Sequence, residues 1–140
     1  MFEQVFEFIG NHPILIGTFV VLLIAFLINE GKQGGTSVSS ANLVNLVNRE
    51  DAIVLDVRDQ KDFNQGHIVD AVNIPYASID NRASELSDKK ESPIVIVCKM
   101  GQHSSAAGKK LKALGFSDVR RLSGGMAEWT AASLPIVKAK

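Results

Sequence analysis

The stretch Pro93-Ile-Val-Ile-Val-Cys98-Lys-Met-Gly101-Gln-His-Ser104-Ser105 determines how this chain is expected to fold. Its first five residues are apolar and mostly β-branched, which is typical of a strand buried on both faces of a parallel sheet. Ser104 and Ser105 are favoured helix N-caps, so a helix is expected to follow and to end near Gly115, a typical C′ residue. The apolar positions of this helix, which share one face, are Ala107, Leu111 and Leu114.

The only cysteine of the chain, Cys98, begins a six-residue loop over residues 98–103. Open α/β sheets bind ligands at the carboxyl ends of their strands, and the polar residues of this loop would be poor neighbours in a core. A sulfur held there faces backbone N–H groups and the positive end of a helix dipole, which favours a thiolate or another anion. A lone cysteine is often only a small buried hydrophobe, but this position predicts a reactive sulfur.

Short apolar strands alternate with helical segments through the rest of residues 38–140. Strands are predicted over residues 52–57, 72–74, 93–97 and 118–122. Helices are predicted after Ser39-Ser40, over residues 60–65 and 78–86, after the cysteine loop, and after Gly124-Gly125. This alternation is typical of βαβ units. The fold class predicted is therefore a three-layer α/β domain, with a central parallel sheet and helices on both faces.

The N-terminal part has a different composition. Residues 8–29 contain no Asp, Glu, Lys or Arg, and as a helix they would be roughly 33 Å long, enough for a hydrocarbon core of about 30 Å. A signal peptide would have a basic n-region, whereas Glu3 and Glu7 precede this run. A buried core helix would need a matching apolar face downstream, and none is apparent. We therefore expect residues 1–29 to form a single-pass membrane anchor helix.

The placement of Lys and Arg predicts how this anchor is oriented. None precedes the apolar segment, Lys32 follows it directly and Arg49 lies further on. The positive-inside rule then predicts an inner-membrane protein whose domain faces the cytoplasm, where reducing conditions suit an unpaired catalytic thiol. Residues 30–37 are rich in Gly and Ser and are predicted to be a flexible linker that keeps the domain near the membrane.

Charge and residue counts exclude several functions. The chain has 15 Lys and Arg against 15 Asp and Glu, and no basic stripe, so nucleic acid is not an expected partner. One cysteine excludes an intramolecular disulfide and a multi-cysteine metal site. The histidines His12, His67 and His103 lack metal-ligand spacing. We expect no metal and no cofactor.

Other polar residues follow strands of the same predicted sheet. Asp56 and Arg58 follow one strand, and on their own they are typical of a structural ion pair. The segment Ser123-Gly124-Gly125 follows another strand. His67 is interpreted as a structural hydrogen-bonding residue and Trp129 as a core residue. Because the carboxyl ends of parallel strands meet at one edge of a sheet, these segments are expected to surround Cys98.

Together these segments resemble the single-domain rhodaneses, the thiosulfate:cyanide sulfurtransferase family. The resemblance rests on Asp56-Val-Arg58, Asp62-Phe63-x-x-Gly66-His67-Ile68, Ala71-Val-Asn73-Ile-Pro75 and Leu122-x-Gly124-Gly125-x-x-x-Trp129, in that order. Cys98 matches the family's active loop in position and length. The resemblance covers residues 38–137, and with the anchor the chain resembles bacterial single-pass rhodanese-like proteins.

The resemblance implies a sulfur relay through Cys98. Its thiolate would take a sulfur from a small donor such as thiosulfate, and the resulting persulfide would pass that sulfur to cyanide, a thiol or a protein cysteine. The loop residues implied to hold donor and persulfide are Lys99, Met100, Gly101, Gln102, His103 and Ser104, with Asp56 and Arg58 as supporting residues. Loop N–H groups can stabilise an anionic persulfide, and Lys99 would attract a dianionic donor.

His103 departs from the family, which often carries Arg or Lys at this loop position. An imidazole is only partly protonated near pH 7. We therefore expect thiosulfate to bind more weakly than in members with the arginine, or to bind more strongly at lower pH.

Other functions of a loop between a strand and a helix have different sequence requirements. A phosphatase or arsenate reductase loop needs an Arg that grips the oxyanion bidentately, and no Arg occurs in residues 98–105. A Walker-type phosphate loop is excluded because Gly-Lys-Ser/Thr is absent. The remaining alternative is a membrane-tethered rhodanese-like binding or scaffold module in which Cys98 is idle.

Overall fold

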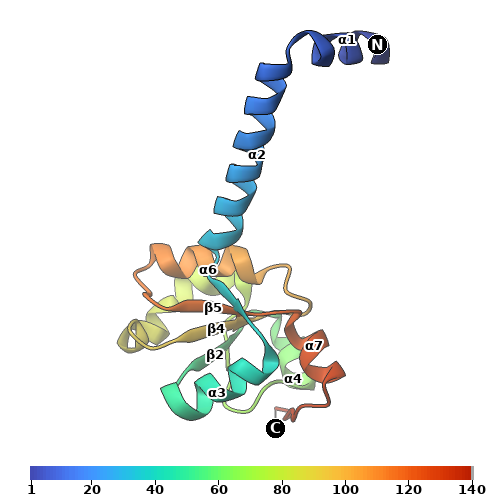
Figure 1. The fold of residues 1–140 in the computed structure, drawn as a ribbon. Coiled ribbons are helices and arrows are strands. Elements are labelled where there is room, and N and C mark those ends of the chain that lie inside the picture. The colour runs from blue at the N-terminus through green and yellow to red at the C-terminus, as the bar shows by residue number, and fades with distance from the viewer. Residues whose placement is uncertain (140) are drawn as a thin grey trace. The chain divides into compact units, whose positions relative to one another are not determined.

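A computed structural model describes residues 1–139, with residues 31 and 32 described in their backbone only. The chain forms two compact units, Met1–Lys32 and Gln33–Lys140 (Figure 1). The elements, in chain order, are α1 (Phe2–Asn11), α2 (Pro13–Gln33), β1 (Thr36–Val38), α3 (Ser40–Glu50), β2 (Ile53–Asp56), α4 (Gln60–Gln65), β3 (Val72–Asn73), η1 (Tyr76–Ser78), α5 (Ile79–Arg82), η2 (Ala83–Lys89), β4 (Ile94–Val97), α6 (Ser104–Ala113), β5 (Val119–Leu122) and α7 (Gly125–Ala131).

The second unit contains a five-stranded sheet with the order β1-β5-β4-β2-β3, and all four strand pairings are parallel. The predicted α/β class with a central parallel sheet is therefore confirmed. Strand β4 lies in the middle, with β2 and β5 as its neighbours. Its register places Val97 beside Asp56, and the N–H of Val57 donates to the carbonyl of Val97 at 2.9 Å. Cys98 therefore emerges beside the residues that follow β2.

The two faces of the sheet bury two separate apolar clusters. Along β4, Ile94 and Ile96 belong to the cluster that contains the α6 residues Ala107 and Leu111. Val95 and Val97 belong instead to the cluster formed with α3 and α7. Figure 1 shows α6 on one face of the sheet and α3 with α7 on the other. This explains the continuous apolar run before Cys98, because successive side chains of β4 point to opposite faces of the sheet and both faces are buried.

Helix α6 begins and ends almost as its sequence predicts. It ends with Gly115 at φ +97°, and the N–H of Phe116 donates to the carbonyl of Leu111 at 3.1 Å, as in a Schellman motif. At the other end the N-cap is His103, one residue before the predicted serines. Leu114 is 38% exposed, so the buried face of the helix is shorter than predicted.

The structure differs from the flexible linker predicted for residues 30–37. Helix α2 continues to Gln33, and Thr36–Val38 pair with β5 as an edge strand. A Cβ on Gly34 would lie 2.5 Å from the Cα of Ser105 in α6. The carbonyl of Gly35 accepts a hydrogen bond of 3.0 Å from Nε of Arg121. Gly34 and Gly35 therefore allow close backbone packing. Their presence was the reason why a flexible linker was predicted.

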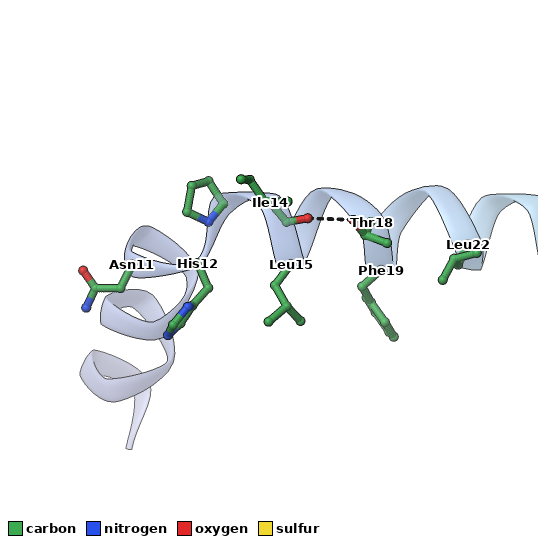
Figure 2. Close-up of a pocket in the computed structure, with 8 residues that line it drawn as sticks. Asn11, His12, Ile14, Leu15, Thr18, Phe19 and Leu22 are labelled. Atoms are coloured by element: carbon green, nitrogen blue, oxygen red, sulfur yellow. Dashed lines mark hydrogen bonds between the residues drawn. The ribbon is translucent and has the colours of Figure 1, made fainter.

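The N-terminal unit consists of two helices where one was predicted over residues 1–29. Helix α1 ends at Asn11, and α2 begins at Pro13 (Figure 2). A residue before proline is disfavoured in the α region, and His12 accordingly has φ −129° and ψ 55°. Within α2, the segment Pro13–Glu30 is long and apolar enough to cross a membrane by length and composition.

Candidate active site

Cys98 lines a cavity at the carboxyl ends of β2 and β4. Its side chain is only 2% exposed. The cavity has a volume of about 280 Å³. It is lined by Val57, Arg58, Asp59, Asp62, Tyr76, Ala77, Cys98, Lys99, Gln102 and His103. The segment after β2, the segment after β3 and the cysteine loop each supply part of this wall, because parallel strands bring their carboxyl ends to one edge.

The cysteine sulfur is held by the backbone of its own loop. The N–H of Gly101 donates to Sγ of Cys98, with the nitrogen 2.7 Å from the sulfur. Gly101 has φ +92°, a conformation that side-chain-bearing residues rarely adopt. Ser104 is almost fully buried, and its hydroxyl donates to the carbonyl of Gly101 at 2.9 Å. Ser104 is thus the first residue of α6, where its hydroxyl fixes the loop instead of capping the helix.

The start of α7 fixes the other side of the loop. The N–H of Met126 donates to the carbonyl of Cys98 at 2.8 Å, and the N–H of Ala127 donates to the carbonyl of Lys99 at 3.0 Å. A Cβ on Gly125 would lie 3.0 Å from the nitrogen of Gly101. The second glycine of the Gly124-Gly125 pair is therefore what allows α7 to approach the loop this closely.

One wall of the cavity is built on a buried ion pair. Asp56 is 1% exposed, and its Oδ2 lies 2.6 Å from Nη2 of Arg58. Nε of Arg58 also donates to both carboxylate oxygens, at 3.0 and 3.1 Å. Nη2 donates in addition to the carbonyl of Gly66 at 2.8 Å, and the amide of Asn73 donates to the carbonyls of Asp56 and Arg58 at 3.0 Å each. The arginine thus orients three chain segments, and most of its charge is compensated.

Another wall is an aromatic stack. The ring of His103 lies 5.6 Å from that of Tyr76, with 16° between their planes. Nζ of Lys110 lies 4.7 Å from the centre of the Tyr76 ring and 2.9 Å from Oδ2 of Asp80. The hydrogen bond to Asp80 is the main reason why the pKa of Lys110 lies above its ordinary value. Lys110 therefore keeps its positive charge beside Tyr76 across the pH range in which an imidazole titrates.

The structure brings some of the predicted site residues together and not others. Arg58, Cys98, Lys99, Gln102 and His103 line the cavity. Gly101 contacts the sulfur through its N–H, whereas Asp56 and Ser104 are buried behind the lining. Met100 is 60% exposed and is not among the lining residues.

Five residues that line the cavity were not among the predicted site residues: Val57, Asp59, Asp62, Tyr76 and Ala77. Asp59 and Asp62 flank the entry to α4, and Tyr76 follows Pro75 of a recognised motif. Their nearness to motif residues was the available signal, but only the packing of α4 and η1 against the loop places them in the wall.

The other singled-out residues are structural. Nδ1 of His67 lies 2.8 Å from the carbonyl of Phe63, and the His67 and Phe63 rings stack at 3.8 Å. Trp129 is 4% exposed, and its Nε1 donates to the carbonyl of Pro135 at 3.0 Å. Within residues 1–139, no group of three or more His, Cys, Asp or Glu side chains gathers as a metal site.

Comparisons with known proteins agree with this geometry. The chain matches the Rhodanese-like domain family over residues 39–132. The Thiosulfate sulfurtransferase GlpE of Pseudoalteromonas translucida is 34% identical over 96 residues, covering 68% of this chain and 89% of that protein. The Uncharacterized protein YibN of Escherichia coli (strain K12) is 32% identical over 142 residues, covering 99% of each chain. A solved rhodanese-related protein from Thermoplasma volcanium has a TM-score of 0.67 at 26% identity, covering 74% of this chain and 99% of its own. The chain therefore belongs to the rhodanese-like family, which includes sulfurtransferases.

Proposed function

We propose that the chain is a sulfurtransferase that carries sulfur on Cys98. The observation that carries this proposal is that Cys98 lines the cavity of about 280 Å³ while the N–H of Gly101 donates to its Sγ. A sulfur that is buried, hydrogen-bonded and open to one cavity can attack a ligand seated there. Cys98 also belongs to the buried apolar cluster that contains Val57 and Ile96, so the hydrogen bond and the cavity are what distinguish it from an idle core cysteine.

The proposed reaction transfers the sulfur in two steps. The Cys98 thiolate attacks the outer sulfur of a donor such as thiosulfate, an S–S bond forms, and sulfite leaves with the electron pair of the broken S–S bond. A nucleophilic acceptor then attacks the outer sulfur of the Cys98 persulfide, and the cysteine thiolate leaves. Backbone N–H groups of the loop can stabilise the negative charge of the persulfide, and the hydrogen bond from Gly101 to Sγ shows that at least one already points inward.

The charges around the cavity favour donors and acceptors other than a small dianion. Arg58 is paired with Asp56, whereas Lys99, the other basic residue of the lining, forms no ion pair with the residues that the structure describes. Asp59 and Asp62 line the same cavity and oppose an incoming anion. We propose that thiosulfate is a weak donor and that the preferred donor is a thiol persulfide, which gives up its outer sulfur.

A second hollow supports a larger acceptor than cyanide. It has a volume of about 310 Å³ and shares Arg58, Asp62 and Lys99 with the cysteine cavity. Its remaining lining residues are Gln65, Gly66, Met126, Thr130 and Ile136. We propose that the acceptor is a thiol, such as a protein cysteine, whose flanking groups occupy this hollow while its sulfur reaches Cys98.

The N-terminal unit supports a proposed location. Helix α2 contains an apolar stretch, Pro13–Glu30, of sufficient length to span a bilayer. No Lys or Arg precedes it, and Lys32 follows it. We propose that this helix anchors the chain in the inner membrane with the Cys98 domain on the cytoplasmic side.

Intact-mass measurement tests the proposed chemistry. The full chain in detergent is treated with thiosulfate, or with a low-molecular-weight thiol persulfide, and freed of reagent. We expect the mass to rise by one sulfur atom in the wild type and to stay unchanged in Cys98→Ala. A subsequent thiol acceptor should remove the added sulfur. An unmodified wild-type mass with both donors would contradict the sulfurtransferase and favour a rhodanese-like binding module.

A further inference from the structure

Helix α1 has an apolar face that none of the described side chains of its own unit covers. Phe2, Val5, Phe6 and Ile9 recur at spacings of three and four, so they share one face of the helix. Their side chains are 79%, 50%, 72% and 41% exposed, respectively. The polar residues Glu3, Gln4, Glu7 and Asn11 occupy the opposite arc. A ten-residue helix with this pattern needs a partner for its apolar face.

The junction between α1 and α2 forms an apolar corner. Figure 2 shows that the chain bends at His12, between α1 and α2. The side chains of Leu15 and Phe19 in α2 point toward the side to which α1 bends. The hollow there has a volume of about 550 Å³, and most of its exposed lining is apolar. The ring of Phe8 lies 4.7 Å from that of His12, and Pro13 has no N–H to continue the first helix. The bend is therefore built into the local sequence.

The length of α2 indicates what covers this surface. The 18 residues Pro13–Glu30 extend about 27 Å as a helix, which already matches a hydrocarbon core of about 30 Å. Helix α1 directly precedes this span, so it would stand at the level of the lipid headgroups. There the phenylalanines can enter the acyl boundary while the carboxylates remain in water.

The charge of α1 selects one side of the membrane. Glu3 and Glu7 are its charged side chains, and no Lys or Arg occurs in residues 1–31. Anionic lipids of a cytoplasmic leaflet attract basic segments and repel acidic ones. We propose that α1 is an interfacial helix that lies in the plane of the non-cytoplasmic leaflet, bent from α2 at His12–Pro13, with Phe2, Val5, Phe6 and Ile9 in the acyl boundary. This inference rests on the proposed membrane anchor and is independent of the sulfur chemistry.

Site-directed spin labelling of the full chain tests the proposal. Cys98→Ala removes the only native thiol, and one label is then attached at Phe6→Cys, Gln4→Cys or Leu22→Cys in vesicles of phosphatidylethanolamine and phosphatidylcholine, which carry no net charge. Collision rates with oxygen, which partitions into acyl chains, and with a water-soluble nickel chelate report depth. We expect the Phe6→Cys label to have a several-fold higher oxygen-to-nickel ratio than its matched polar-face control, Gln4→Cys. The Leu22→Cys label should have the highest ratio.

The three labels distinguish the possible failures. Equal nickel exposure at positions 4 and 6 with a deep Leu22→Cys label would keep the anchor and overturn the interfacial helix. Deep burial of both α1 labels would mean that α1 continues into the bilayer, which also overturns it. Spin–spin broadening at Phe6→Cys would identify a second copy of the chain as the partner instead of lipid. A water-exposed Leu22→Cys label would overturn the anchor itself, while sulfur transfer, measured on the wild type, would be unaffected.

Discussion

Replacement of Gly125 by alanine tests whether the approach of α7 to the cysteine loop creates the site. Gly125 has φ +58°. A Cβ there would lie 3.0 Å from the nitrogen of Gly101 and 3.0 Å from the carbonyl carbon of Cys98. Both contacts are with backbone atoms, so the loop or the helix must move. The nitrogen of Gly101 is the one that donates to Sγ of Cys98, and any movement therefore changes the position of the sulfur relative to its donor.

The expected magnitude has two parts. A side chain in the left-handed region costs about 1–2 kcal/mol relative to glycine, and overpacking against the loop costs about 1–3 kcal/mol more. The free energy of unfolding should fall by about 2–5 kcal/mol, which leaves a domain of average stability, about 10 kcal/mol, folded. Because a displacement of 1 Å can reduce a rate about 100-fold, we expect Cys98 persulfide formation to slow by about 10- to 100-fold.

Gly115→Ala is the matched control for Gly125→Ala. Gly115 has φ +97°, so alanine there has at least as much backbone strain, but its Cβ would lie 3.5 Å from the flexible Nζ of Lys90. Urea unfolding of both full-length variants can be followed by the fluorescence of Trp129, the only tryptophan. Persulfide formation is measured by intact mass against time. Equal rates in the two variants would refute the reasoning, because the loss would then come from backbone strain alone.

Three further predictions concern the walls of the site. Arg58→Ala leaves the buried carboxylate of Asp56 without its partner, so the free energy of unfolding should fall by about 3–5 kcal/mol. Arg58→Lys should lose less, and a fully stable Arg58→Ala chain in urea would contradict this. His103→Arg adds a fixed charge, and one charge-assisted hydrogen bond to the donor would lower the KM for thiosulfate about tenfold at pH 8. An unchanged KM would argue against a role for loop charge. Ser104→Ala removes the hydroxyl that binds the carbonyl of Gly101, and we expect a loss of about 1 kcal/mol in urea unfolding together with slower persulfide formation. Wild-type values of both quantities would show that the hydroxyl does not hold the loop.

Local sequence signals predicted the central part of the domain well. The run before Cys98 is apolar at every position because β4 is buried on both faces. The predicted helix over residues 60–65 and the stop of α6 at Gly115 are both observed. Each of these features depends on the periodicity or the backbone preference of neighbouring residues. Such preferences can be read from a short segment without knowing what packs against it.

The errors occurred where a segment depends on a distant partner. Thr36–Val38 form a strand because β5 supplies hydrogen bonds, and the glycines before it pack against α6. Composition alone cannot distinguish a glycine needed for close packing from one that makes a chain flexible. The break before Pro13 was a local signal, but the uniform apolar character of residues 13–29 obscured it.

Hydrophobic periodicity and turn residues act locally, and they are enough to predict a parallel α/β domain with one cysteine at the end of a strand. The surroundings of that cysteine depend on how distant segments pack. Tyr76 and Asp62 reach the cavity from separate segments, and Arg58 is tied to Asp56 and Gly66. Residues that are distant in the chain together determine the charge and the shape of the site. They meet only because the parallel sheet brings the carboxyl ends of its strands to one edge.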